Sequence, residues 1–154
     1  MKSLLLPSVA LFAFITPTIV AAPRPPAVYG GFEVGKKFTF TVNTRSSASN
    51  SGAGLVNPAP IPKGVPNLAV GQQVTFTIGK KGELKAPKIN LAFLSDGGTS
   101  NSYMGKVKAG NISSATVGKN PTTGEPTGIA LYYVVNKVSR TGITSSQVTY
   151  TLNP

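Results

Sequence analysis

The chain has 154 residues, a formal net charge of +11, and no cysteine, histidine or tryptophan. This length is typical of one domain. The missing residue types exclude disulfides, thiolate nucleophiles, a Ser-His-Asp triad and histidine-bound metals. The carboxylate side chains are Glu33, Glu83, Asp96 and Glu125 alone. We therefore expect a protein that is not an enzyme and that needs no metal and no cofactor.

Residues 1–21 have the pattern of a secretory signal peptide. Lys2 supplies the positive start, residues 4–20 are largely apolar, and two small residues follow. Cleavage after Ala21 is favoured, because the next possible position would leave a proline at the new N-terminus. A membrane anchor is the alternative, but the prolines within the apolar stretch and the single flanking charge favour a cleaved signal. We expect a secreted, extracellular protein.

The first predicted strand covers residues 37–43, after a Pro/Gly-rich leader at residues 22–31. Its apolar residues alternate with threonines, which indicates a strand with one buried face. A second such strand covers residues 73–78. The segment 32–42 aligns without a gap with the segment 68–78, and both contain a Val-Gly pair and Thr-Phe-Thr. Either the domain contains two related β units, or the same local sequence pattern arose twice independently.

Further strands are expected along residues 32–154, which form the single domain. Four prolines keep residues 57–66 out of a central strand, and residues 46–54 have the composition of a loop. The other predicted elements are a turn at 79–82 leading into 83–85, a more fully buried strand at 88–94, strands at 103–108 and 113–117, a turn-rich loop at 118–128, the longest and central strand at 129–138, and a last strand at 147–152. The pattern predicts an all-β domain, either an antiparallel β-sandwich or a β-barrel.

The alternation within each strand predicts which side chains are buried, because successive strand residues point to opposite faces. The predicted core consists of Phe38, Phe40, Val42, Val74, Phe76, Ile78, Leu91, Phe93, Leu131, Tyr133, Val148, Tyr150 and Leu152. Of the adjacent pair Tyr132 and Tyr133, one belongs to the core and the other is exposed. An exposed tyrosine there could join Tyr29 and Tyr103 as a platform for a sugar.

Acid–base catalysis by paired carboxylates is the main enzymatic alternative, as in glycoside hydrolysis. Glu83, Asp96 and Glu125 lie in or beside glycine-rich turns, where we expect them to be solvated. A Ser-Lys nucleophile would require a lysine with a lowered pKa, and no Ser-x-x-Lys spacing marks one. The segment 79–82 lacks the spacing of a phosphate-binding loop.

Lysines form several clusters that are candidates for binding an anionic surface. They are Lys36, Lys37, Lys80, Lys81, Lys85, Lys88, Lys106 and Lys108. A strongly positive field attracts acidic polysaccharide, anionic lipid headgroups or nucleic acid. Alternatively, exposed lysines serve solubility and protect strand edges from aggregation. We do not expect nucleic acid as a partner, because export separates the chain from it and no stacking aromatics interleave with the lysines.

Asn111 begins an Asn-Ile-Ser sequence, which is a glycosylation site in a eukaryotic secreted protein and has no such meaning in a bacterial one. The sequence leaves the source and the oligomeric state open.

Several phrases of the sequence resemble those of fungal secreted proteins. They are the Lys-Ser-Leu-Leu-Leu start, the Ala-Pro-Arg-Pro-Pro segment, Val-Gly-Gln-Gln-Val-Thr-Phe-Thr-Ile at 70–78 and Val-Thr-Tyr-Thr-Leu at 148–152. The chain is similar in character to the hypersensitive-response-inducing elicitors of plant-pathogenic fungi. The resemblance implies a non-enzymatic effector that a host cell-surface component recognises, with defence or cell death as the result. It supplies no site residues.

The phrase at 70–78 is also similar to the start of Ig-like modules in bacterial surface proteins. Two alternative functions therefore accompany the effector hypothesis. One is a structural or polysaccharide-binding protein of the cell wall. The other is a surface adhesin or fibre module, in which the leader or an edge strand pairs with a neighbour.

Overall fold

The computed structural model describes residues 25–108, 110–140 and 142–154. The predicted signal peptide and its cleavage position lie outside these residues. The described residues form strands and no helix. The strands are β1 (Val28–Tyr29), β2 (Phe32–Glu33), β3 (Lys37–Ser51), β4 (Gly54–Val56), β5 (Gln73–Ile78), β6 (Leu84–Ala86), β7 (Ile89–Asp96), β8 (Ser100–Met104), β9 (Ile112–Lys119), β10 (Pro126–Ser139) and β11 (Gly142–Asn153).

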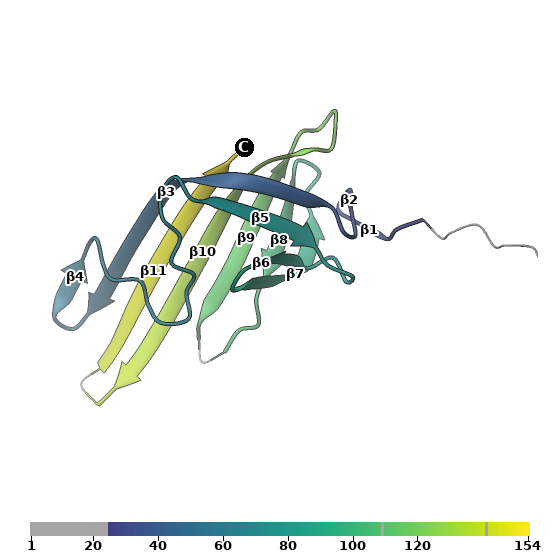
Figure 1. The fold of residues 1–154 in the computed structure, drawn as a ribbon. Helices are drawn as coiled ribbons and strands as arrows, with labels where there is room; N and C mark the ends of the chain where they lie inside the picture. Colours follow the sequence, from purple (N-terminus) through teal and green to yellow (C-terminus); the bar gives the residue numbers. More distant parts are fainter. Residues whose placement is uncertain (1–24, 109, 141) are drawn as a thin grey trace, which may run out of the picture.

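The strands from β5 to β11 pair antiparallel in chain order, and β3 pairs with both β5 and β11. The hydrogen-bonded ladder therefore returns to its starting strand and closes an up-and-down barrel (Figure 1). Closure removes free sheet edges from the ring, and β4 hangs outside it on β3 alone. The prediction of an all-β antiparallel sandwich or barrel is confirmed.

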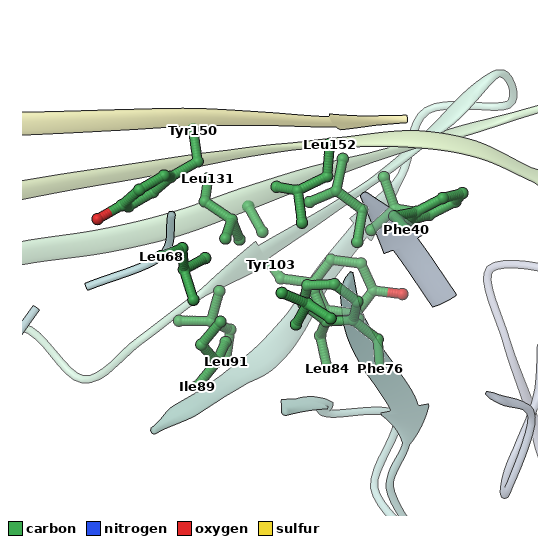
Figure 2. Close-up of a cluster of buried hydrophobic side chains, with 14 of the residues drawn as sticks. Phe40, Leu68, Phe76, Leu84, Ile89, Leu91, Tyr103, Leu131, Tyr150 and Leu152 are labelled. Atoms are coloured by element: carbon green, nitrogen blue, oxygen red, sulfur yellow. The ribbon is translucent and has the colours of Figure 1, made fainter. Parts of the chain in front are cut away.

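The core fills the inside of the ring. Side chains from β10 and β11, such as Leu131, Tyr150 and Leu152, meet those of β5, β6 and β7 (Figure 2). Of the predicted core residues, Phe38 and Phe93 are partly buried and pack against the cluster, whereas the others are buried. Small barrels of this kind enclose packed side chains rather than a channel.

The two sequence repeats pair with each other about a local two-fold axis. The axis passes the pair Thr39 and Thr75, whose hydroxyls are 2.7 Å apart. The Val-Gly turns have the same conformation, with φ of 89° at Gly35 and 84° at Gly71. The amide of each glycine donates to the carbonyl of the last residue of the other repeat, at 2.8 Å: Gly35 to Ile78 and Gly71 to Val42. Residues 32–42 and 68–78 therefore adopt the same local structure.

The predicted loop at residues 46–54 is wrong except for residues 52–53, because β3 continues to Ser51 and β4 begins at Gly54. Residues 46–50 pair with β11 between Ser145 and Thr149. The Ser47 hydroxyl, which points inward, donates to the Ala59 carbonyl at 2.6 Å. Pairing with a neighbouring strand thus overrides the loop preference of a serine-rich sequence.

Three other strand predictions need correction. The β7 strand alternates between buried and exposed residues, so the fully buried strand predicted at 88–94 is half-buried. The β8 strand ends at Met104, so Lys106 and Lys108 lie in the following loop and not on a strand face. The loop predicted at 118–128 shortens, because β9 ends at Lys119 and β10 begins at Pro126. The β10 strand is paired on both sides as predicted, but β3 is longer.

A short hairpin of β1 and β2 covers one end of the barrel. Phe32 in β2 is completely buried. The Gly30 carbonyl accepts hydrogen bonds from Asn101 Nδ2 and Lys119 Nζ, both at 2.9 Å, and Lys119 Nζ also lies 2.6 Å from Asp96 Oδ1. Residues 28–31, which the sequence places in the leader, are therefore part of the folded domain.

The Gly30→Ala substitution should destabilise the fold by about 2–4 kcal/mol, because it combines a left-handed backbone with a collision. The φ of Gly30 is 55°, and an added Cβ would overlap the buried Asn101 side chain. Gly31→Ala is the matched control, with φ of 83° and open space around its Cβ, and should cost only about 1 kcal/mol. Equal urea midpoints for the two variants would contradict this account of the hairpin.

Acid should weaken the hairpin through Asp96. The hydrogen bond from Lys119 is the main cause that lowers the pKa of Asp96 below its ordinary value of 3.8. The ionised carboxylate therefore stabilises the native state above pH 3.8, and this contribution is lost as pH falls through the lower native pKa. Asp96→Asn should lower the free energy of unfolding at neutral pH, as measured by urea unfolding. On acidification the variant should then lose less stability than the wild type does. Glu125→Gln, which removes a carboxylate from an exposed ion pair at the same end, is the matched control in the same measurement.

Candidate functional site

The order of the loops separates the charges of this protein. Successive loops of an up-and-down barrel lie at alternate ends, because neighbouring strands run in opposite directions. The loops after β6, β8 and β10 share one end and carry Lys88, Lys106, Lys108 and Arg140. Lys63 joins this end from the proline-rich segment, and Lys137 joins it from the end of β10. These six residues form the cationic end.

All four carboxylate side chains lie toward the opposite end, in β2 and at the turns after β5, β7 and β9. Three of them pair with different lysines: Glu125 with Lys36 at 2.9 Å, Asp96 with Lys119 at 2.6 Å and Glu83 with Lys85 at 3.6 Å. The Lys81 amide also donates to Glu83 and lowers the pKa of that carboxyl. Ion pairs thus offset positive charge at this end, whereas none of the six cations of the cationic end forms an ion pair with a described residue. Lys106 does share a surface depression with Lys81 and Glu83.

A pocket of about 220 Å³ opens at the cationic end. Its rim carries the exposed lysines Lys63, Lys88 and Lys106. Buried apolar side chains, including Ile89 and Leu91, form its inner wall. No carboxylate is among the residues that line it. The pocket therefore combines a positive rim that has no carboxylate with a lining of both apolar and polar side chains, Asn90, Asn111 and Ser113 among the polar ones.

Tyr133 also lines this pocket, and it is 6% exposed. Its hydroxyl is buried without a hydrogen-bond partner among the described residues. Tyr150, whose ring lies 6.4 Å away, by contrast donates its hydroxyl to the Pro66 carbonyl at 2.6 Å. Burial raises the pKa of Tyr133 strongly, so its hydroxyl stays protonated. Native buried polar groups are nearly always hydrogen-bonded, and among the described residues the Tyr133 hydroxyl shares its unpaired state with the Tyr103 hydroxyl and Asn101 Oδ1.

Lys88 has a left-handed backbone, with φ of 62°, and no other described residue except glycine has a positive φ. It follows Pro87 in the turn between β6 and β7, at the position where such turns favour glycine. A lysine in this conformation costs roughly 1–2 kcal/mol. Unfavourable backbone conformations of this kind cluster at functional sites.

The structure divides the eight predicted lysines into separate groups. Lys88 and Lys106 meet at the pocket rim, and Lys108 lies at the same end. Lys36, Lys37, Lys80 and Lys81 lie toward the opposite end, and Lys85 pairs with Glu83. Sequence reasoning missed Lys63, because only the path of the proline-rich segment brings it to the pocket. Tyr133 was expected in the core, but nothing in the sequence marks its hydroxyl.

Asn111, the predicted glycosylation site, lines the same pocket. Its side-chain oxygen accepts a hydrogen bond from the Asn136 amide at 2.8 Å. Glycosylation remains a prediction, and a glycan at this residue would stand at the pocket.

No protein family, no curated protein and no solved structure matches the chain. The part of the chain that the structure describes has no helix with the length and hydropathy to span a bilayer. Within the same residues, no group of three or more carboxylate side chains could hold a metal ion.

Replacing Lys88 tests whether the positive φ at this position costs stability, and whether the side-chain amine contributes to stability. Lys88→Gly should stabilise the fold by about 1 kcal/mol, because glycine adopts a positive φ without steric cost. Lys88→Ala removes the same amine and keeps the strain, so its stability should stay within about 0.5 kcal/mol of the wild type. Urea unfolding measures both. If Lys88→Ala were more stable than Lys88→Gly, the turn would not be strained.

Proposed function

We propose that this chain is an exported, non-enzymatic recognition protein that holds an anionic polysaccharide of the host cell surface with its cationic end. One observation carries the proposal: six cations share an end of the barrel that has no carboxylate, while all four carboxylates lie toward the other end. A concentrated positive field attracts a polyanion more strongly than the same charge spread evenly.

The alternative explanations of the lysines account less well for this distribution. Protection of strand edges is needed only where edges are free. It can account for Lys137, which lies where β10 extends past β9 and pairs with β11 alone, but the other five cations lie outside that stretch. The cations of the cationic end lie mainly in loops. Solubility requires net charge, but it does not require that the charge be gathered at one end.

The resemblance to fungal elicitors supplies the biological setting. In that setting the polyanion is the pectin of a plant cell wall, and capture there brings the effector to the surface where it triggers defence or cell death. Anionic membranes carry the same kind of charge, so vesicles serve as a comparison.

The other hypotheses from the sequence have weaker support. A fibre subunit needs a free edge for pairing, and among the described strands β4 offers one outside the ring. A platform for neutral sugar needs exposed aromatic faces. Tyr103 and Tyr133 are buried, which leaves Tyr29 and Tyr132 on different parts of the barrel.

Two triple variants with the same change in charge test the proposal. Lys63→Gln, Lys106→Gln and Lys108→Gln together remove half of the cationic end, and Lys37→Gln, Lys80→Gln and Lys81→Gln together are the control at the other end. All six side chains are exposed, so both variants should fold. On immobilised polygalacturonate the first variant should bind about tenfold more weakly and elute at lower salt. The control should lose less than half as much binding free energy.

Equal losses in the two variants would show that only total charge matters, and the proposal would fail. Binding to a neutral glucan that resists salt would point instead to a sugar site. For the effector role, the folded protein is infiltrated into leaves. The wild type should cause cell death, with a weaker response to the first variant, and the absence of any response at micromolar dose would contradict that role.

A further inference from the structure

We propose that the cationic end docks on an anionic lipid bilayer, with its cations at the phosphate headgroups and the aliphatic side chains of its loops in the outer part of the acyl layer. This goes beyond capture of a polysaccharide, because it adds a second kind of surface. It also uses outward-facing aliphatic side chains, on which binding of a sugar polymer does not depend.

Exposed apolar side chains gather at the cationic end. The five most exposed large apolar side chains among the described residues are Val138 (77%), Leu55 (70%), and Val70, Val107 and Ile143 (62% each). Val70 lies beside Asn153, at the far end of β11. The other four lie at the cationic end, in the loop after β8 and beside the turns of the β10–β11 and β3–β4 hairpins. The second of these turns belongs to this end because the end of β3 pairs with the start of β11. Single exposed apolar residues are ordinary, but a group of them marks an interaction site.

The strand register puts three of these side chains on one outward face. Val138 pairs directly with Ile143, and paired residues point to the same side of a sheet. Ser145, two residues after Ile143 and therefore on the same face, pairs with Asn50, which in turn pairs with Leu55. This face is the outer one, because the even-numbered residues of β11 supply its core side chains. Leu55 and Ile143 lie on strands two positions apart, a lateral separation of about 10 Å.

The two hairpins extend past the strands that flank them in the ring. The β9 strand pairs with β10 no further than Val134, and β5 pairs with β3 no further than Thr41. The strands β4, β3, β11 and β10 therefore continue to their turns beyond these neighbours (Figure 1). Both hairpins have two-residue turns, so the aliphatic side chains lie close to the projecting tips. Side chains in this position can meet a flat surface.

The same loops carry cations beside the aliphatic side chains. The loop after β8 has the sequence Lys-Val-Lys at 106–108, and Val138 lies between Lys137 and Arg140. None of these cations forms an ion pair with a described residue. Each cation near an anionic bilayer contributes about fivefold to binding, and apolar side chains contribute in proportion to the area that they bury there. These loops therefore offer both contributions together.

A bilayer fits these side chains better than a protein partner does. The polar residues Asn50 and Ser145 separate Leu55 from the pair on β10 and β11, so the aliphatic side chains do not form one continuous patch. A protein interface has a closely packed apolar centre, usually with aromatic anchors, whereas a bilayer accepts each side chain where it meets the surface. The cations of this end also complement anionic headgroups, and the carboxylates of the chain lie toward the other end.

Vesicle binding by two double variants tests the proposal. The vesicles contain phosphatidylcholine and phosphatidylserine at roughly two to one, and the wild type should bind them more tightly than pure phosphatidylcholine. Val138→Thr with Ile143→Thr keeps every cation and the branched shape that strands favour, and it should weaken binding to the anionic vesicles about tenfold. Val70→Thr with Leu94→Thr, at side chains of similar exposure away from this end, is the control and should stay within about twofold of the wild type.

A single tryptophan reports insertion directly, because the chain has none. The fluorescence of Val138→Trp should shift to the blue on anionic vesicles and be quenched by brominated acyl chains, whereas that of Leu94→Trp should do neither. Equal vesicle binding by the wild type and the variant with Val138→Thr and Ile143→Thr would overturn the proposal, because charge alone would then hold the protein. Loss of a concentration-dependent dimer in that variant, with unchanged vesicle binding, would assign the side chains to a second copy of the chain instead.

The outcome is separable from that of the proposed function. The variant with Val138→Thr and Ile143→Thr should bind polygalacturonate like the wild type, because its charge is unchanged. An equal loss on both surfaces would contradict the assignment of these side chains to lipid. If the wild type is retained on polygalacturonate but does not bind anionic vesicles, the bilayer proposal fails and the polysaccharide proposal stands. Vesicle binding with insertion at residue 138, without retention on polygalacturonate, would do the reverse.

Discussion

The pairing of β3 with β11 is the interaction on which the rest of the structure depends. It joins the first and last strands of the ring over Thr41–Asn50 and Ser145–Asn153, with one register shift beside Leu152. Without it, the other pairings would form an open sheet with two free edges and a half-exposed apolar face. With it, the inward residues of all strands share one enclosed core, which a chain without disulfides requires.

Because the strands form a closed meander, their order also determines at which end of the barrel each charged residue lies. Consecutive loops alternate between the two ends, and so do these charged residues: Glu83 after β5, Lys88 after β6, Asp96 at the end of β7, Lys106 after β8 and Glu125 after β9. The turn after β5 also carries Lys80 and Lys81, so the end with the carboxylates has mixed charge. A pattern that looks mixed in the sequence therefore becomes two chemically different ends. The same rule brings Lys88 and Lys106 to one pocket without any cluster in the sequence, and the proline-rich segment adds Lys63.

The sequence was sufficient for features that local periodicity encodes and insufficient for those that a distant partner decides. Alternation of apolar residues with threonines predicted β5 and the first half of β3, and the repeat predicted their equivalent turns. The serine-rich half of β3 has no such alternation and becomes a strand because β11 lies beside it. Lys63 lies at the pocket because Val65 and Leu68, which follow it in the chain, pack into the core. No residue spacing in the sequence predicts this packing.

Recognition through one end of the barrel is the central claim, and amide chemical-shift mapping tests it most directly. Isotope-labelled protein is titrated with a short galacturonate oligomer at physiological salt, and the shift of each amide is measured. The account predicts that saturable shifts concentrate around Lys63, Lys88 and Lys106, with small changes around Lys36, Lys80 and Lys81. Equal shifts at both ends, or shifts confined to the outer faces of the strands, would contradict it.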